Sequence, residues 1–367
     1  MRRLAQLQVA LGVLWVLDAL LQLQPELLGP GLAAGIADSA MGQPARIQSA
    51  LVAFANLVAR DPGVASVAIA CVQGAIGVAI LAPRTRRLGL VASVPWALGV
   101  WVLGEGLGGV ATGFASLLGG APGPAVLYAA AAVLVLPARG AGAHAEPGAA
   151  AACFGALGER GAAALWGALW ATTALLQSVP VVTLGFKLSA GFQMASLGEP
   201  SPFASLDRAF GRSSATHGPE ITGVLLLLEL AAGSAALARG PWRRRLLVAS
   251  IGVCALCWVV GENAGALLTG SASDPGAMPL YCLIAVSMLE SRAGARTGSA
   301  PLGGSSSALA PVACLPVACL PVASSPPPRA AARARRRPRA ALGRWTAASS
   351  TRTEPAPTRS PPAASVG

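Results

Sequence analysis

The sequence WVLGEGLGGVATGFAS at residues 101–116 recurs as WVVGENAGALLTGSAS at residues 258–273. The Trp-Val, Gly-Glu, Thr-Gly and Ala-Ser pairs keep the same order and spacing in both stretches. A composition rich in Ala and Leu produces chance matches of small residues, but not a shared Trp, Glu and Thr-Gly in one order. A repeat governs the whole architecture, so it is the first feature to establish. These two stretches predict a chain built from two copies of one unit.

The similarity extends in both directions from these stretches. Upstream of each one lie a Leu-Trp pair in an apolar run, a Gly-x-Pro turn and a basic turn, at nearly constant separation. The matching segments are Leu14-Trp15 with Leu169-Trp170, Ala19–Gln22 with Ala174–Gln177, Gly42–Pro44 with Gly198–Pro200, Arg86–Leu88 with Arg244–Leu246 and, downstream, Tyr128 with Tyr281.

Both copies contain apolar runs of about the length that crosses a bilayer. The chain is 54% hydrophobic and 11% charged, whereas soluble domains carry about 25% charged residues. A spanning helix needs about 20 mainly apolar residues, and lipid offers no partners to the backbone of an open strand. The expected spans are 4–23, 63–81, 88–110 and 120–136 in the first copy, and 162–182, 221–238, 246–268 and 276–289 in the second.

The predicted fold is therefore an all-α polytopic membrane helical bundle, with about eight transmembrane helices in two parallel four-helix repeats. Basic residues occur in every second connection, as at Arg84–Arg87 and Arg239–Arg245. By the positive-inside rule this pattern predicts that both termini lie in the cytoplasm. The expected location is the plasma membrane. The first run resembles a signal peptide, but it is long for one and has a counterpart in the second copy.

Composition divides the chain into four segments. We predict a first repeat at 1–138, a cytoplasmic linker at 139–161, a second repeat at 162–290 and a disordered tail at 291–367. The tail is rich in Pro, Ala and Arg and has no periodicity that would support a core. Its Arg run at 333–339 is expected to contact anionic lipid headgroups. Nucleic acid is not expected as a partner, because no binding fold accompanies the run.

A further helix is expected after Gly42-Gln43-Pro44. Ile47, Leu51, Phe54 and Val58 recur there at helical spacing. This helix would lie in the outer membrane interface or pack as part of a loop.

Several polar residues fall within or near the apolar runs. Glu105 and Glu262 occupy matching positions near the outer end of the third span of each copy. A charged side chain in the bilayer costs about 2.5–3.5 kcal/mol on insertion scales, so it usually faces the protein interior or water. The two glutamates would line a polar transport cavity, or would bind loop backbone. Three further candidates are Asp18, Glu229 and Gln73. Gln73 stands where the second copy has Glu229. The alternative is that these residues cap backbone groups or pair with Arg.

Small residues at every fourth position allow helices to approach closely. We therefore predict that a stripe in the third span of each copy packs against another helix. The stripe comprises Gly104, Gly108 and Thr112 in the first copy and Gly261, Gly265 and Thr269 in the second.

No catalytic residue, metal site or cofactor is predicted. Cys254 and Cys257 share a helix face, but no second cysteine pair or His accompanies them. His144 and His217 lie outside the expected spans. The sequence also contains no phosphate-binding loop, hydrolase elbow or zinc-protease motif.

The second copy resembles the DoxX-type four-helix membrane proteins. The resemblance rests on Gly198-Glu199-Pro200, on Glu229–Gly233 and on the basic turn Arg243–Arg245. The first copy has Gln73 where the pattern has Glu. The repeated Trp-Val-x-Gly-Glu block is more similar to uncharacterised actinobacterial integral membrane proteins. The DoxX family includes a small subunit associated with thiosulfate:quinone oxidoreduction. Because the chain lacks redox ligands, the resemblance implies a four-helix unit and no activity.

Two functional hypotheses follow. The first is transport of a small solute or ion through a polar cavity near Glu105 and Glu262. The alternative is a non-catalytic subunit or scaffold of a membrane complex, for example a quinone-linked redox complex. Besides the bilayer, the expected partner is another membrane protein or a second copy of the chain. A membrane enzyme ranks last, because no catalytic constellation is visible.

Overall fold

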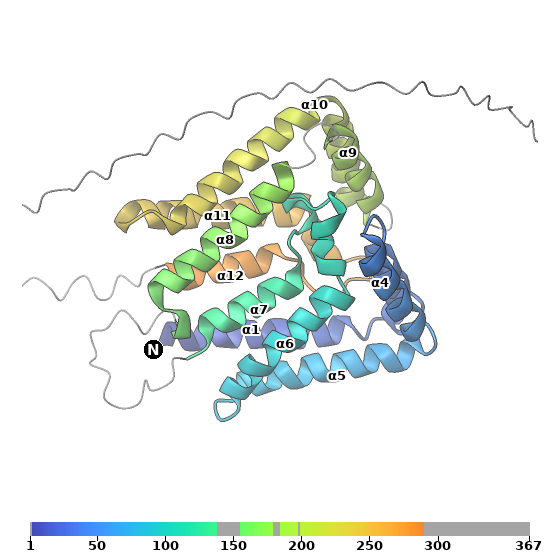
Figure 1. The fold of residues 1–367 in the computed structure, drawn as a ribbon, viewed down its shortest axis with the longest axis horizontal. Coiled ribbons are helices and arrows are strands. Elements are labelled where there is room, and N and C mark those ends of the chain that lie inside the picture. The colour runs from blue at the N-terminus through green and yellow to red at the C-terminus, as the bar shows by residue number, and fades with distance from the viewer. Residues whose placement is uncertain (1, 138–154, 179–183, 197–198, 290–367) are drawn as a thin grey trace, which may run out of the picture. The chain divides into compact units, whose positions relative to one another are not determined.

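The computed structural model describes residues 2–137, 155–178, 184–196 and 199–289, which form helices and loops without a strand among them (Figure 1). They belong to one compact unit, Met1–Pro301. The longer elements are α1 (Arg2–Leu21), α3 (Gly31–Ser39), α4 (Ala45–Val58), α5 (Pro62–Leu81), α6 (Arg86–Leu103), α7 (Pro124–Val135), α8 (Gly158–Ser178), α9 (Leu184–Ala195), α10 (Ser201–Gly233), α11 (Gly240–Val260) and α12 (Met278–Met288). The short elements are α2 (Pro25–Leu28) and the 3-10 helices η1 (Gly106–Thr112), η2 (Leu117–Gly119), η4 (Gly155–Leu157), η6 (Ser234–Ala236) and η7 (Asn263–Ala266).

Four helical segments are long and apolar enough to cross a membrane: Leu4–Leu21, Pro62–Leu81, Arg86–Leu103 and Ser201–Ala236. The helices α8 and α11 have 21 residues each, but charged residues occupy their first turns. The helices α7 and α12 have only 12 and 11 residues. At 1.5 Å per residue they are about 18 Å long or less, whereas the hydrocarbon core of a bilayer is about 30 Å thick.

The long helices expose apolar side chains and bury polar ones. On α5, Val64, Val67 and Val78 are exposed, whereas Ser66 and Gln73 are buried. A helix on the surface of a water-soluble protein has the opposite pattern. Polar side chains in membrane helices face the protein interior in this way.

The helices pack in two sequential groups that meet at α7 and α12. In the first group α1, α5, α6 and α7 are neighbours, and in the second α8, α10, α11 and α12. The helix α7 packs against α12, and α1 contacts both. The largest fully buried side chains lie around this contact: Trp15, Tyr128, Trp166, Trp170 and Tyr281.

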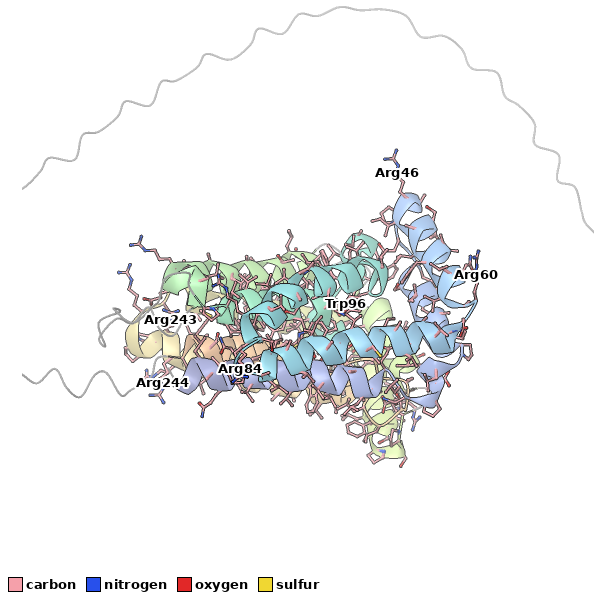
Figure 2. The ribbon with its side chains drawn as sticks, turned by 90° about the horizontal axis from the view of Figure 1, so that it is seen from below. Arg46, Arg60, Arg84, Trp96, Arg243 and Arg244 are labelled. Atoms are coloured by element: carbon pink, nitrogen blue, oxygen red, sulfur yellow. The ribbon has the colours of Figure 1, made fainter. Side chains whose placement is uncertain are left out.

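Two shorter helices, α4 and α9, lie across one end of the long helices (Figure 1). The helix predicted after Gly42-Gln43-Pro44 is confirmed as α4, which buries Leu51, Ala55 and Val58. Arg46 and Arg60 mark the end of the unit that carries α4, whereas Arg84, Arg243 and Arg244 lie at the opposite end (Figure 2).

In the second group, the segment that matches α4 and the long helix that follows it form one element, α10. Asp61-Pro62 separates α4 from α5, and the Asp61 carboxylate accepts a hydrogen bond from Val64 N at 3.1 Å. At the matching place α10 continues through a bend, with His217 at φ −122° and Pro219 inside the helix. Proline removes a backbone donor and disturbs the preceding turn, which explains the bend.

The third helix of each group ends earlier than the sequence predicted. The spans 88–110 and 246–268 were expected, but α6 ends at Leu103 and α11 at Val260. Four left-handed residues follow each helix. They are Gly106, Leu107, Gly108 and Gly109 with φ of 55, 59, 59 and 70°, and Asn263, Ala264, Gly265 and Ala266 with φ of 48, 55, 72 and 51°.

The predicted stripe of small residues is therefore wrong as a helical feature. Gly104 and Gly261 are C-cap residues, and the other four positions lie in the loops beyond them. At Gly108 a Cβ would overlap Pro122 O, and at Gly265 it would overlap Pro275 O. Thr112 and Thr269 donate to backbone carbonyls three residues earlier in these loops. These small residues do allow a close approach, but it is between two loop segments and not between two helices.

Part of the predicted domain division lies outside the described residues, namely most of the linker 139–161 and the tail 291–367. Within the linker the described part begins at Gly155, and α8 already begins at Gly158.

Candidate functional site

A cavity of about 620 Å³ lies among α1, α3, α5, α6 and α7 of the first group. The loop at 271–274, which precedes α12 of the second group, also lines it. Three of the predicted site residues, Asp18, Gln73 and Glu105, face it together. The other polar side chains in its lining are Gln22, Tyr128, Ser271, Ser273 and Asp274, and the aromatic ones are Trp15, Phe54 and Trp96.

Asp18 is the most deeply placed carboxyl group of the cavity. It lies on α1, is 2% exposed, and accepts a hydrogen bond from Tyr128 Oη of α7 at 2.8 Å. The Trp15 ring packs on the Tyr128 ring, with centroids 4.4 Å apart. The aromatic pair therefore fixes the position of the hydroxyl group that holds the carboxylate.

Glu105 is placed by the loop that follows α6. Its Oε1 accepts from Ala125 N, in the first turn of α7, at 2.9 Å. Trp101 Nε1 donates to Pro122 O at 2.7 Å and holds the two segments together. A helix N-terminus carries roughly half a positive charge, so it offsets only part of the charge of the carboxylate. Burial raises the pKa of Glu105 well above its usual value.

Asp274 comes from the second group. Its carboxylate accepts from Gly276 N at 2.8 Å and from Ser273 Oγ at 2.9 Å. Gln24 Nε2 donates to Ala272 O at 3.2 Å and ties this loop to the first group. Burial also raises the pKa of Asp274.

These three carboxyl groups give the cavity an acidic character. No Lys, Arg or His is among the residues that line it. A carboxylate removed from water without a cation nearby is costly, so each group favours either a bound proton or a bound cation. The arrangement can therefore hold a positively charged species or protons.

Four buried polar atoms in the lining have no hydrogen-bond partner among the described residues: Trp15 Nε1, Gln73 Oε1, Trp96 Nε1 and Glu105 Oε2. Buried polar atoms in proteins are usually paired. Two of these atoms are acceptors and two are donors, so the site offers contacts to a polar ligand.

Glu262 also accepts from backbone N–H groups at the start of a short helix, but it uses both carboxylate oxygens and does not line this cavity. Its carboxylate accepts from Ala277 N at 2.9 Å and from Met278 N at 3.1 Å, at the start of α12. Trp258 Nε1 donates to Pro275 O at 2.7 Å, as Trp101 does to Pro122. Burial raises the pKa of Glu262 to about 8. For this residue the geometry agrees with the alternative role of binding loop backbone.

Glu229 also lies away from the cavity. It is fully buried on α10, and neither carboxylate oxygen has a partner within the described part of the chain. On α11, Cys254 and Cys257 are both buried, and the Cys282 thiol of α12 donates to Ile251 O of α11 at 3.9 Å. The described residues contain no cluster of His, Cys, Asp and Glu that fits a metal ion.

Sequence reasoning missed Asp274, Gln22 and Trp96 as lining residues. Asp274 follows the repeated Thr-Gly-x-Ala-Ser block and has Leu117 at the matching place of the first copy. That difference was the available signal, but only the packing of the loop against the first group gives it meaning.

No protein-family model, curated protein or solved structure matches this chain. The resemblance to DoxX-type proteins therefore stays a prediction.

Proposed function

We propose that this chain is a multi-pass membrane protein that transports a small cationic solute, with the cavity around Asp18, Glu105 and Asp274 as its binding site. The observation that carries the proposal is the convergence of three carboxyl groups, from three separate segments, on one cavity with no basic side chain in its lining.

The repeated local geometry supports two parallel four-helix repeats as the scaffold. A left-handed run of four residues, a Glu bound to the start of a short helix, and a Trp bound to a Pro carbonyl occur once in each group. In membrane proteins, short helices and irregular backbone are tolerated where they line a cavity or are buried in protein. Transporters often bind substrates at such broken helices, between repeats.

The acidity of the cavity suggests exchange of the cation for protons. Without a cation, a buried carboxyl group is stabilised by binding a proton, in keeping with the raised pKa of Glu105 and Asp274. When a cation binds, the carboxylic acid gives up its proton and the resulting carboxylate pairs with the cation. The proton leaves to water.

Reconstituted protein on a solid-supported membrane tests the transport proposal. Concentration jumps of Na⁺, K⁺ and phenethylammonium should give a transient current with at least one of these ions. We expect Asp18→Asn and Glu105→Gln each to reduce the current at least tenfold. Glu262→Gln is the matched control, because Glu262 binds backbone like Glu105 but lies outside the cavity.

Two results would contradict transport through this cavity. One is the absence of current with every ion, and the other is an unchanged current in both cavity variants. A current that appears only in the presence of a co-purified protein would favour the alternative of a subunit in a membrane complex.

A further inference from the structure

We propose that the ligand of this cavity is an amphipathic organic amine, bound as a protonated ammonium group with at least one N–H bond. This inference rests on the proposed cation site and names the class of cation.

The size of the cavity favours an organic ligand over a bare metal ion. Its volume of about 620 Å³ falls within the range of about 300–1,000 Å³ that is usual for small-molecule sites. Bound Ca²⁺ or Mg²⁺ requires several oxygen ligands at about 2.0–2.6 Å, and no group of residues in the described part of the chain is arranged for a metal.

The walls of the cavity are mainly apolar and aromatic. Leu27, Leu32, Ile36 and Leu103 lie in the lining together with the four rings of Trp15, Phe54, Trp96 and Tyr128. Apolar walls bind an apolar body, and aromatic faces attract a cation. An inorganic ion has no apolar body to place against the apolar walls.

The unpaired acceptors favour an ammonium group that carries hydrogen. Glu105 Oε2 and Gln73 Oε1 are buried and find no donor among the residues described here. A primary, secondary or tertiary ammonium group donates N–H bonds to such oxygens, and a charge-assisted bond to a carboxylate is among the stronger ones. A quaternary ammonium group has no N–H bond to donate and would leave both acceptors unpaired.

Binding calorimetry of the full chain in lipid nanodiscs tests this inference, with empty nanodiscs to correct for partition into lipid. The probes are phenethylamine, its N,N,N-trimethyl derivative, 2-phenylethanol and KCl. In 2-phenylethanol a neutral hydroxyl group replaces the ammonium group. We expect phenethylamine to bind at least tenfold more tightly than the alcohol and more tightly than the quaternary derivative.

Variants connect the binding to this cavity. Gln73→Leu removes one acceptor without changing charge and should weaken phenethylamine at least threefold, with a smaller effect on the alcohol, whose neutral hydroxyl group donates a single, weaker hydrogen bond. Asp18→Asn should weaken the amine at least tenfold. If Asp18→Asn does not fold, Gln73→Leu still decides the matter. Glu262→Gln should bind as the unsubstituted chain does.

The inference is overturned if the alcohol binds as tightly as the amine, if none of the organic probes binds, or if Gln73→Leu and Asp18→Asn both bind normally. The outcomes separate it from the proposed function. Currents with Na⁺ or K⁺ but no amine binding would refute the amine and preserve cation transport. Amine binding without any current would preserve the site and refute transport.

Discussion

The two tyrosines at matching positions of the short helices make different contacts. Tyr128 donates to the buried Asp18. Tyr281 is also fully buried, but its hydroxyl group has no partner within the described residues. The reason lies on the facing helix, where Thr173 stands at the position that matches Asp18 and bonds to Trp170 O at 2.9 Å. One hydroxyl group orients a carboxylate, and the other has no such role.

This difference makes a prediction about stability. Tyr128→Phe leaves a buried carboxyl group without its partner, which costs about 1–3 kcal/mol. We expect a lower melting temperature for Tyr128→Phe, measured by tryptophan fluorescence in nanodiscs. For Tyr281→Phe the free energy of unfolding should stay within about 0.5 kcal/mol of that of the unsubstituted chain, because the substitution removes a hydroxyl group that has no partner within the described residues. Equal losses in the two variants would contradict the assignment of the Asp18 contact.

The buried carboxyl groups also predict how ligand affinity depends on pH. Because burial raises the pKa of Glu105 and Asp274, the neutral forms persist to higher pH than in a free carboxyl group. A cation pairs with the ionised form, so its affinity should be lowest at acid pH and should rise as pH increases through these pKa values. The rise is about tenfold per pH unit for each proton released.

Calorimetry of phenethylamine between about pH 5 and pH 8.5, in buffers of different ionisation enthalpy, counts the protons released on binding. Affinity that stays constant over this interval would contradict the exchange of a cation for protons.

At the scale of elements, the loops after α6 and α11 have the least ordinary geometry. Each turns left-handed for four residues and brings a glycine against the carbonyl of a proline. In the first loop this close approach lets Glu105 reach the start of α7. The turn thus brings the start of α7 against the Glu105 carboxylate.

We therefore expect Gly108→Ala to be strongly destabilising. Its φ of 59° is unfavourable for a side chain, and an added Cβ would overlap Pro122 O. The same holds for Gly265→Ala against Pro275 O. Strained backbone costs about 1–3 kcal/mol at each such residue, and the overlap adds to that cost.

The control for these glycine variants is Gly252→Ala. Gly252 lies inside α11 with open space around its Cα, and alanine is the better helix former by about 0.5–1 kcal/mol. Melting temperatures of the three variants check the prediction. If Gly108→Ala melts like Gly252→Ala, the left-handed turn is not the native geometry.

At the scale of the whole unit, the long helices have a basic end and an opposite end that carries α4 and α9 (Figure 2). Arg84 and Arg244 lie at the basic end although they are far apart in the sequence, and Arg46 lies at the other. Parallel threading of two repeats stays a prediction from the distribution of Arg in the sequence.

Cysteine labelling tests that threading. In a chain whose native cysteines are replaced, Arg84→Cys and Arg244→Cys should react with a membrane-impermeant maleimide from the same side of sealed vesicles. Arg46→Cys should react from the opposite side. Labelling of Arg84→Cys and Arg244→Cys from different sides would exclude two parallel repeats.

Apolar runs predicted the helices well, because the length and hydropathy of a segment are local properties. The ends of α6 and α11 were not predictable in this way. Residues 104–110 are apolar and small, and their left-handed path depends on contact with the Pro122 backbone. The cavity was predictable only in part. Asp18, Gln73 and Glu105 were identified as polar residues in apolar surroundings, whereas Asp274 joins them through packing between segments distant in the chain.

Asp274 has a consequence for the origin of such a chain. A symmetric pair of identical half-length proteins would have an acid at both of these loop positions or at neither. Once the two halves share one polypeptide, each is free to diverge, and the later half can supply an acid to its neighbour alone. Leu117 is the counterpart of Asp274 in the earlier half, so at this position only the later half contributes a carboxyl group to its neighbour. Two copies of residues 1–138, expressed without the remainder, would therefore lack the third acid however well they assembled.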